Sequence, residues 1–307
     1  MKKQFKTTIG GQAVLEGIMM KGVEESALAV RKPDGTVYLE TWKNKSGRWY
    51  NKTPFIRGVV NFVSQLVSGY KCLMKSAEIS TEGLEEGNPS KFDQWLEEKF
   101  GDKLVKIVGV VSMILGIGIA MLLFMYLPAL LTSLAKSFMP VWSLSLIEGL
   151  IKIALFIGYM AATSLMPDMK RLYQYHGAEH KTIACYEAGE ELTVENIRKL
   201  CRFHPRCGTS FIFLVLFIGI LVFSLVTWSN ALLRSVLKLA LMPVVVSIAY
   251  EIIRIAGRHD NLFTRIISWP GLKIQHLTTK EPEDDQIEVA VTAMTQVLPK
   301  VKGEDKW

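Results

Sequence analysis

The sequence predicts an α-helical membrane protein with four transmembrane helices and a small cytoplasmic α+β part formed by the N- and C-terminal segments. Three observations support this fold class. Hydrophobic residues make up 50% of the 307 positions, and four apolar windows are close to the ~20 residues that a bilayer core requires. Basic residues are concentrated in one loop between the windows. Alternating and helical patterns outside the windows predict the cytoplasmic part.

The predicted transmembrane helices are 104–127, 146–166, 209–228 and 232–253. The apolar pattern of the first continues past Pro128 towards Ala135, which predicts a long, tilted or broken helix. Ionisable groups lie near the ends of the windows, where we expect Glu148 to pair with Lys152, and Arg234 and Lys238 to reach the surface. Because these ionisable groups are not in the middles of the windows, a solute transporter is less supported than an enzyme or a scaffold.

The distribution of basic residues predicts the orientation. Seven of them lie between the second and third windows: Lys170, Arg171, Lys181, Arg198, Lys199, Arg202 and Arg206. The positive-inside rule places this loop and both termini in the cytoplasm, so the protein is predicted to be a multi-pass cell-membrane protein. Its cysteines then face a reducing compartment, which predicts thiols or metal ligands. The net charge of +7 follows from these loops, and we expect membrane lipids and no nucleic acid as partners.

Six consecutive segments are expected. They are a cytoplasmic β-rich segment (1–52), an amphipathic helix and linker (53–102), transmembrane helices (103–166), a cytoplasmic helical hairpin (167–208), transmembrane helices (209–256) and a cytoplasmic strand-helix segment (257–307). Pro33-Asp34-Gly35 predicts a turn between two strands. Thr53 and Pro54 predict the start of the amphipathic helix, which fits either the membrane interface or a position under the sheet. We expect His276 on a strand beside Leu272 and Ile274.

One helix carries a pattern that suggests chemistry. The helix predicted after Pro167 places His176 and His180 one turn apart on one face, which is the spacing that two imidazoles need to reach one metal ion. Glu179 completes the order H-x-x-E-H, the inverted form of the zinc-protease motif. In that arrangement the carboxylate is the base for metal-bound water. The alternative is an ordinary polar face of a cytoplasmic helix.

Several residues could complete a metal site. A second helix is predicted at about 194–204. His204 lies at its end, and Cys207 follows three positions later. With the two helix histidines they could form a closed structural site, while three ligands and water would form a catalytic one. Glu187 and Glu251 are further candidates as a ligand or a supporting carboxylate. Packing is the preferred role of Cys201. Arg202 and Arg206 could hold an anion or lipid headgroup, or be plain surface charges.

Five stretches carry a resemblance to a known family and cover nearly the full chain in order: GGQAVLEGIMMKG, PFIRGVVNF, HGAEHKTIACYE, LTVENIRKLCRFHPRCGTSF and PGLKIQHLTTKEPEDDQIEVA. In them the chain resembles the YqhQ family of bacterial multi-pass membrane proteins, described as uncharacterised, predicted metal-dependent enzymes. The resemblance implies that His176, Glu179, His180, His204 and Cys207 belong to one site. It implies no substrate.

The leading interpretation is a metal-dependent hydrolase, with zinc as the expected ion, whose site faces the cytoplasm near the bilayer. His176 and His180 would bind the ion, and Glu179 would take a proton from bound water and return it to the leaving group. The alternative is a non-catalytic scaffold or chaperone that docks another membrane complex, such as the protein export or insertion machinery. The sequence determines neither the substrate nor the oligomeric state.

Overall fold

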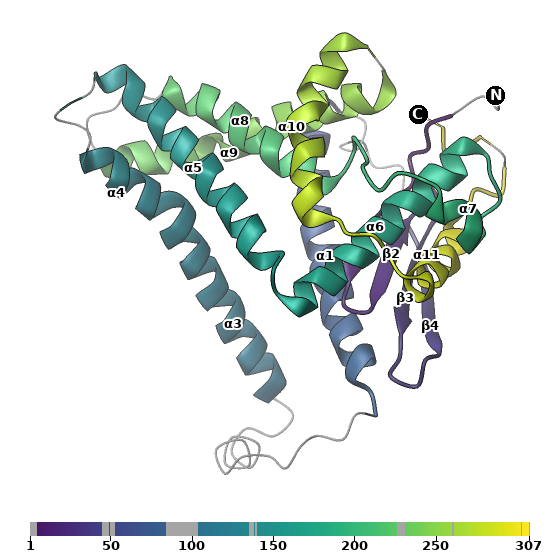
Figure 1. Cartoon of the computed structure of the whole chain (residues 1–307). Helices are drawn as coiled ribbons and strands as arrows, with labels where there is room; N and C mark the ends of the chain where they lie inside the picture. Colours follow the sequence, from purple (N-terminus) through teal and green to yellow (C-terminus); the bar gives the residue numbers. More distant parts are fainter. Residues whose placement is uncertain are drawn as a thin grey trace. The chain divides into compact units, whose positions relative to one another are not determined.

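A computed structural model describes residues 5–44, 49, 53–83, 104–134, 138, 140–225, 231–259, 261–301 and 303–306 (Figure 1). The chain splits into two compact units. Met1–Glu82 and Ile157–Trp307 form the first unit, and Gly83–Phe156 forms the second.

The first unit contains an antiparallel sheet with the strand order β1-β2-β3-β4 among the described residues. The strands are β1 (Gly10–Val14), β2 (Gly17–Lys21), β3 (Glu25–Arg31) and β4 (Val37–Lys43). At the predicted turn between β3 and β4, Gly35 has a φ of 85° and the Asp34 carboxylate accepts a hydrogen bond from the Thr36 amide. The β-rich N-terminal segment is therefore confirmed.

Helices cover both faces of this sheet. Ile18 and Met20 of β2 pack with α6 (Pro167–Ala188) and α11 (Asp284–Val297), while Met19, between them, packs with Cys72 of α1 (Ile56–Thr81). Successive side chains of a strand point to opposite faces, so a sheet covered on both faces has apolar residues at successive positions. This explains the unbroken apolar runs in β2 and β3.

The amphipathic helix α1 lies under the sheet and also along α9 (Ala231–Arg258). Its glycines allow both contacts, because a Cβ at Gly69 would meet the Gln12 side chain at 2.4 Å and one at Gly58 would meet Ser247 at 3.0 Å. The predicted start of this helix at Thr53 and Pro54, with Thr53 as its cap, is wrong, because Phe55 is the N-cap. The Thr53 hydroxyl donates to the Trp49 carbonyl instead, and the helix begins at Ile56. The linker predicted after α1 falls within residues 84–103, which are outside the described part of the chain.

Two elements after the histidine helix differ from the prediction. The second helix, α7, spans only Val194–Arg198. At its last residue, the Arg198 carbonyl accepts a hydrogen bond from the Lys181 ammonium of α6. The segment with His204 therefore lies outside any helix.

The predicted strand around His276 is wrong, because residues Leu262–Thr278 form the helix α10. Asn261 and Thr264 make a reciprocal capping box at its start. The buried positions include Gly271, Ile274 and Thr278, which repeat at helical intervals. The alternation that suggested a strand does not match burial, since His276 is exposed.

The apolar windows form long helices. In the second unit, α3 (Leu104–Met121) continues through the π-helix η3 (Leu122–Tyr126) into α4 (Leu127–Leu134), so the first window does run past Pro128, as predicted. The helix α5 (Val141–Thr163) follows, with Lys152 paired to Glu148 at 2.7 Å. Lys238 of α9 lies over the Phe223 ring, and the Arg234 side chain lies outside the described residues.

Three helices in the described part of the chain are long and apolar enough to cross a membrane: Val108–Leu134, Ser143–Thr163 and Val236–Arg258. A further apolar helix, α8 (Gly208–Ser224), has 17 residues and is shorter than these three helices. The protein is thus mostly helical with three candidate membrane spans and a small sheet, and the fourth predicted span is not confirmed.

The chain crosses α6 at very short range after α10. The Lys280 amide donates to the Tyr173 carbonyl at 2.8 Å, and a Cβ placed on Gly177 would lie 2.0 Å from the Lys280 carbonyl oxygen. Only a residue without a side chain permits this approach. The crossing matters because it brings the C-terminal end of α10 against the helix that carries the histidines.

We predict that Gly177→Ala destabilises the protein. The added methyl group must push the backbone at Lys280 away, which costs about 1–3 kcal/mol and lowers the thermal unfolding midpoint by several degrees. Gly158→Ala is the matched control, because Gly158 lies within α5 and its added Cβ meets nothing within 4 Å. Thermal unfolding of the purified protein measures both. Equal midpoints for the two variants would contradict the close crossing.

Candidate functional site

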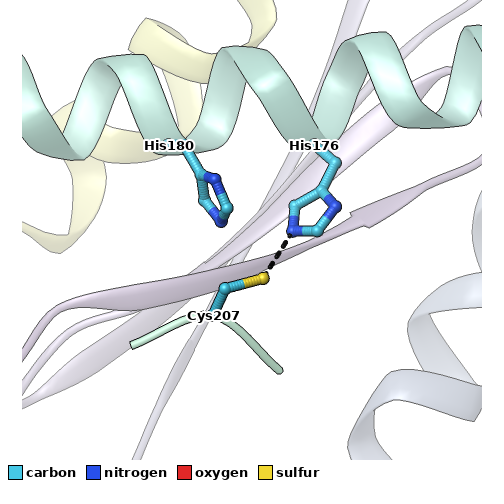
Figure 2. A group of neighbouring side chains, drawn as sticks. All are labelled: His176, His180 and Cys207. Carbon is cyan, nitrogen blue, oxygen red and sulfur yellow. Dashed lines mark hydrogen bonds between the residues drawn. The ribbon is translucent and has the colours of Figure 1, made fainter. Parts of the chain in front are cut away.

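The two histidines of α6 and a cysteine from the start of α8 meet at one point. His176 and His180 extend from α6 towards Cys207 (Figure 2). One ligand atom from each of the three residues lies within 4.8 Å of the other two. The sequence predicted the two histidines and the cysteine as parts of one site, and the structure brings these three together.

Each imidazole is oriented by a backbone carbonyl. The Nδ1 atom of His176 lies 2.8 Å from the Thr278 carbonyl oxygen, and that of His180 lies 2.6 Å from the Arg202 carbonyl oxygen. A neutral imidazole that donates from Nδ1 keeps its Nε2 lone pair available. Metal-binding histidines are held in this way in most proteins. Both carbonyls come from irregular or helix-end segments that sequence patterns do not single out.

Cys207 is the N-cap residue of α8. Its Sγ atom lies 3.2 Å from His176 Nε2 and 3.1 Å from the Thr209 hydroxyl oxygen. Burial acts to raise the pKa of the thiol, but the charges of His176 and His180 outweigh it and hold this pKa well below its ordinary value. For His176 the effects are reversed: burial lowers the pKa of the imidazole, but the Cys207 charge outweighs it and raises this pKa to about 9. The pair therefore favours a thiolate next to an imidazolium when no metal ion is bound.

Glu179 is buried beside this group, with 5% of its surface exposed. It lies against β1, where a Cβ on Gly11 would come within 3.0 Å of the Glu179 carboxyl carbon. Burial raises the pKa of this carboxyl group above its usual range, against the opposing charges of His180 and His176. Its carboxylate is not among the three converging ligand atoms. No sequence pattern indicated this contact between Gly11 and Glu179, because it joins residues far apart in the chain.

His204 is near the group but engaged elsewhere. Its ring lies 5.4 Å from the His180 ring, and its Nε2 atom is 3.1 Å from the Arg206 guanidinium. Burial and then the Arg206 charge hold the pKa of His204 well below its ordinary value. The ring is therefore neutral and accepts a hydrogen bond from Arg206. The structure does not bring His204 into the converging ligand set.

The other predicted site residues have partners within the chain. Glu187 pairs with Arg206 and accepts a hydrogen bond from the Thr7 amide, so it supports His204 through Arg206. Arg202 pairs with Glu281 at 2.6 Å. An anion or headgroup role for the two arginines stays a prediction.

Glu251 and Cys201 are not among the three converging ligands. Glu251 pairs with Arg57 and so joins α9 to α1. Cys201 is exposed, so packing does not explain it.

A buried glutamine that the sequence did not reveal holds the segment before Cys207. The Gln275 side chain donates to the His204 carbonyl at 2.7 Å and accepts from the His204 amide at 2.7 Å. It also donates to the Ser210 hydroxyl at 3.0 Å. A fully buried polar side chain requires such partners. The sequence contained one signal for this role, because Gln275 lies among apolar residues. That segment was predicted as a strand, although it is a helix.

The donor set is suitable for a zinc ion. Zinc prefers thiolate and imidazole ligands, and tetrahedral geometry separates its ligand atoms by roughly 3.5 Å. The 3.2 Å between His176 Nε2 and Cys207 Sγ is close to that separation. Three protein ligands would leave one position open, as in catalytic zinc sites. The same contact also resembles a cysteine and base pair in nucleophilic enzymes.

Comparisons with known proteins identify the family. A family model described as "Protein of unknown function (DUF1385)" matches residues 53–300. The "Uncharacterized protein YqhQ" of Bacillus subtilis (strain 168) is 35% identical over 310 residues, which cover 97% of this chain and 94% of that protein. No solved structure matches the chain. The chain thus belongs to the DUF1385 family of proteins of unknown function, and its resemblance to YqhQ is confirmed.

Proposed function

We propose that His176, His180 and Cys207 bind a divalent metal ion, zinc by the chemistry of the ligands, and that this centre is hydrolytic. The convergence of three ligand atoms within 4.8 Å carries the proposal. The carbonyls of Thr278 and Arg202 support it, because they bind the Nδ1 atoms of both rings and so leave the Nε2 atoms for the ion. Zinc at this position would supply Lewis acidity that polarises a carbonyl or phosphoryl oxygen of the substrate.

Glu179 is the acid-base residue of the proposed reaction. It is not one of the converging ligands, it is buried, and its raised pKa suits a group that accepts a proton from water and gives it to the leaving group. Burial also keeps bulk water away from the carboxyl group. The hydrogen-bonding contact with Gly11 and the packing of β1 hold it in place.

The location of the proposed site follows from α8. Cys207 lies at the first turn of an apolar helix that packs on α9, one of the candidate membrane spans. The centre is therefore at the edge of the membrane-spanning region. The basic residues of 167–208 favour the cytoplasmic side under the positive-inside rule.

A second candidate function uses no metal. Cys207 Sγ is 3.2 Å from His176 Nε2, and Cys207 is at a helix N-terminus, where a thiolate is stabilised. In this case the Cys207 thiolate would attack a carbonyl carbon, the His176 imidazolium would give its proton to the leaving group, and water would then hydrolyse the thioester. The convergence of a second imidazole, His180, favours the metal centre. A purely structural pin or docking scaffold has no need of a buried Glu179.

We predict about one zinc ion per chain in the purified wild-type protein. His176→Ala and Cys207→Ala lose the ion because each removes a ligand, whereas Glu179→Gln keeps it. Plasma mass spectrometry of protein recovered from detergent measures the content. His259→Ala is the control, because His259 is exposed at the end of α9 and its loss leaves the ion in place. A folded wild-type protein without metal would contradict the proposal and favour the cysteine nucleophile.

Cobalt substitution tests the thiolate ligand directly. We predict that the cobalt-loaded protein shows near-ultraviolet sulfur-to-cobalt charge-transfer absorption, which Cys207→Ser removes and Cys201→Ser keeps. Cys201 is a matched control because it is the exposed cysteine of the described residues. Absorption that persists in Cys207→Ser would assign the metal to other ligands.

A comparison of cells tests for catalysis without knowledge of the substrate. We predict that cells with Glu179→Gln accumulate the same compound as cells lacking the protein, because loss of a general acid-base residue slows turnover about 10²–10⁴-fold. Mass spectrometry of membrane extracts compares these strains with the wild type. The variant must retain wild-type protein levels and zinc. If Glu179→Gln cells match the wild type while the deletion does not, the protein acts as a scaffold.

A further inference from the structure

The exposed face of α10 carries large apolar side chains over the first half of the helix, with the exposed Arg265 as the charged residue among them. Its large exposed side chains are Leu262 at 75%, Phe263 at 63%, Ile266 at 62% and Trp269 at 60%. Residues 262, 266 and 269 lie on one side of a helix, and Phe263 flanks them. Further along, the exposed positions Lys273 and His276 are polar. The apolar surface is therefore confined to the end of α10 that follows α9.

The opposite face of α10 is packed against other helices. A Cβ on Gly271 would lie 2.4 Å from the Ser210 hydroxyl oxygen of α8, and Ile267 packs on the apolar cluster formed by α8 and α9. The buried face is thus fully used by contacts within the first unit. The face with Leu262 and Ile266 needs an apolar environment from outside the described chain, because large contiguous apolar surface is unfavourable in water.

The position of α10 points to a bilayer as that environment. The candidate span Val236–Arg258 ends three positions before Asn261, the N-cap of α10. The start of α10 is therefore at the depth where a membrane-spanning helix leaves the bilayer. Trp269 has the Lys273 ammonium 5.7 Å from its ring centre, and tryptophan and lysine are enriched at this depth, where lysine reaches lipid phosphates.

We propose that α10 is a membrane-surface helix whose Leu262, Phe263 and Ile266 side chains enter the headgroup and upper acyl region of a lipid bilayer. Trp269 lies at the boundary, and Lys273 contacts lipid phosphates. This is the arrangement of helices that lie in the interface rather than span it. It rests on the packing and exposure of α10 and holds whether or not a metal ion is bound.

The same helix fixes the depth of the histidine and cysteine group. Thr278, the last residue of α10, provides the carbonyl that orients His176. The Gln275 side chain forms hydrogen bonds with both the amide and the carbonyl of His204. A helix that lies on the bilayer through its first half thus holds the site through its second half. The group is kept next to the lipid headgroups and cannot move away from them as an independent domain could.

Quenching of a fluorescent label tests the depth of α10. The full-length protein carries Cys201→Ser, which removes the exposed cysteine, together with Ile266→Cys labelled with bimane. It is placed in nanodiscs of phosphatidylcholine and phosphatidylglycerol. One quencher is a nitroxide on the upper acyl chain of the lipid, and the other is iodide in the water. We expect the ratio of lipid to iodide quenching at position 266 to exceed that of a water-exposed position severalfold.

Two matched variants calibrate the measurement. Ile114→Cys lies in the candidate span of α3 and is 61% exposed, so it reports lipid. Gln296→Cys is an exposed position of α11 and reports water. The Cys201→Ser parent without an added cysteine measures background labelling, and size-exclusion profiles matching the parent show that the variants fold. Iodide quenching at 266 equal to that at 296 would overturn the proposal. Protection from both quenchers would overturn it too, because a protein or a second copy would then cover the face.

Discussion

The burial of one polar helix on almost all sides is the constraint on which the rest of the first unit depends. Buried residues follow one another along α6 from Gly177 to Ile183, although several of them are polar or charged. Each such group costs free energy unless it finds a partner. His180 finds a carbonyl of the segment before α8, and Lys181 finds Glu281 at 2.5 Å and the Arg198 carbonyl. The polar residues of α6 therefore determine where three separate segments of the chain can lie.

This constraint explains which parts of the fold the sequence could predict. Local signals were sufficient for the turn at Gly35 and for α6, because Pro33-Asp34-Gly35 is a turn sequence and Pro167 marks the start of the helix. The sequence pattern failed where distant contacts decide. The helix α7 ends early beside Lys181 of α6, and α10 is a helix although a short alternation over residues 272–276 suggested a strand. Five residues of alternation are weak support when the buried positions repeat at helical spacing.

The candidate site shows the same division. The spacing of His176 and His180 requires only one helix, so it was visible in the sequence. Cys207 was one of several nearby candidates, and only the tertiary fold separates it from His204, whose ring binds Arg206. Glu251 is drawn to α1 by Arg57, which no local pattern could reveal. The orienting carbonyl of Thr278 depends on the crossing at Gly177, a backbone contact without a side-chain signature.

The three converging residues also join different layers of the molecule. His176 and His180 belong to a helix packed on the sheet, while Cys207 begins a helix packed on a candidate membrane span. An ion held by them would tie the sheet layer to the membrane helices, which a purely structural site would also achieve. The buried carboxyl group of Glu179 separates the two roles. A hydrolytic centre requires an acid-base group near the ion, whereas a structural ion does not, and the burial of Glu179 to 5% exposure raises its pKa. In the proposed hydrolytic centre Glu179, which lies against β1 beside Gly11, would be the group that takes up the proton and returns it.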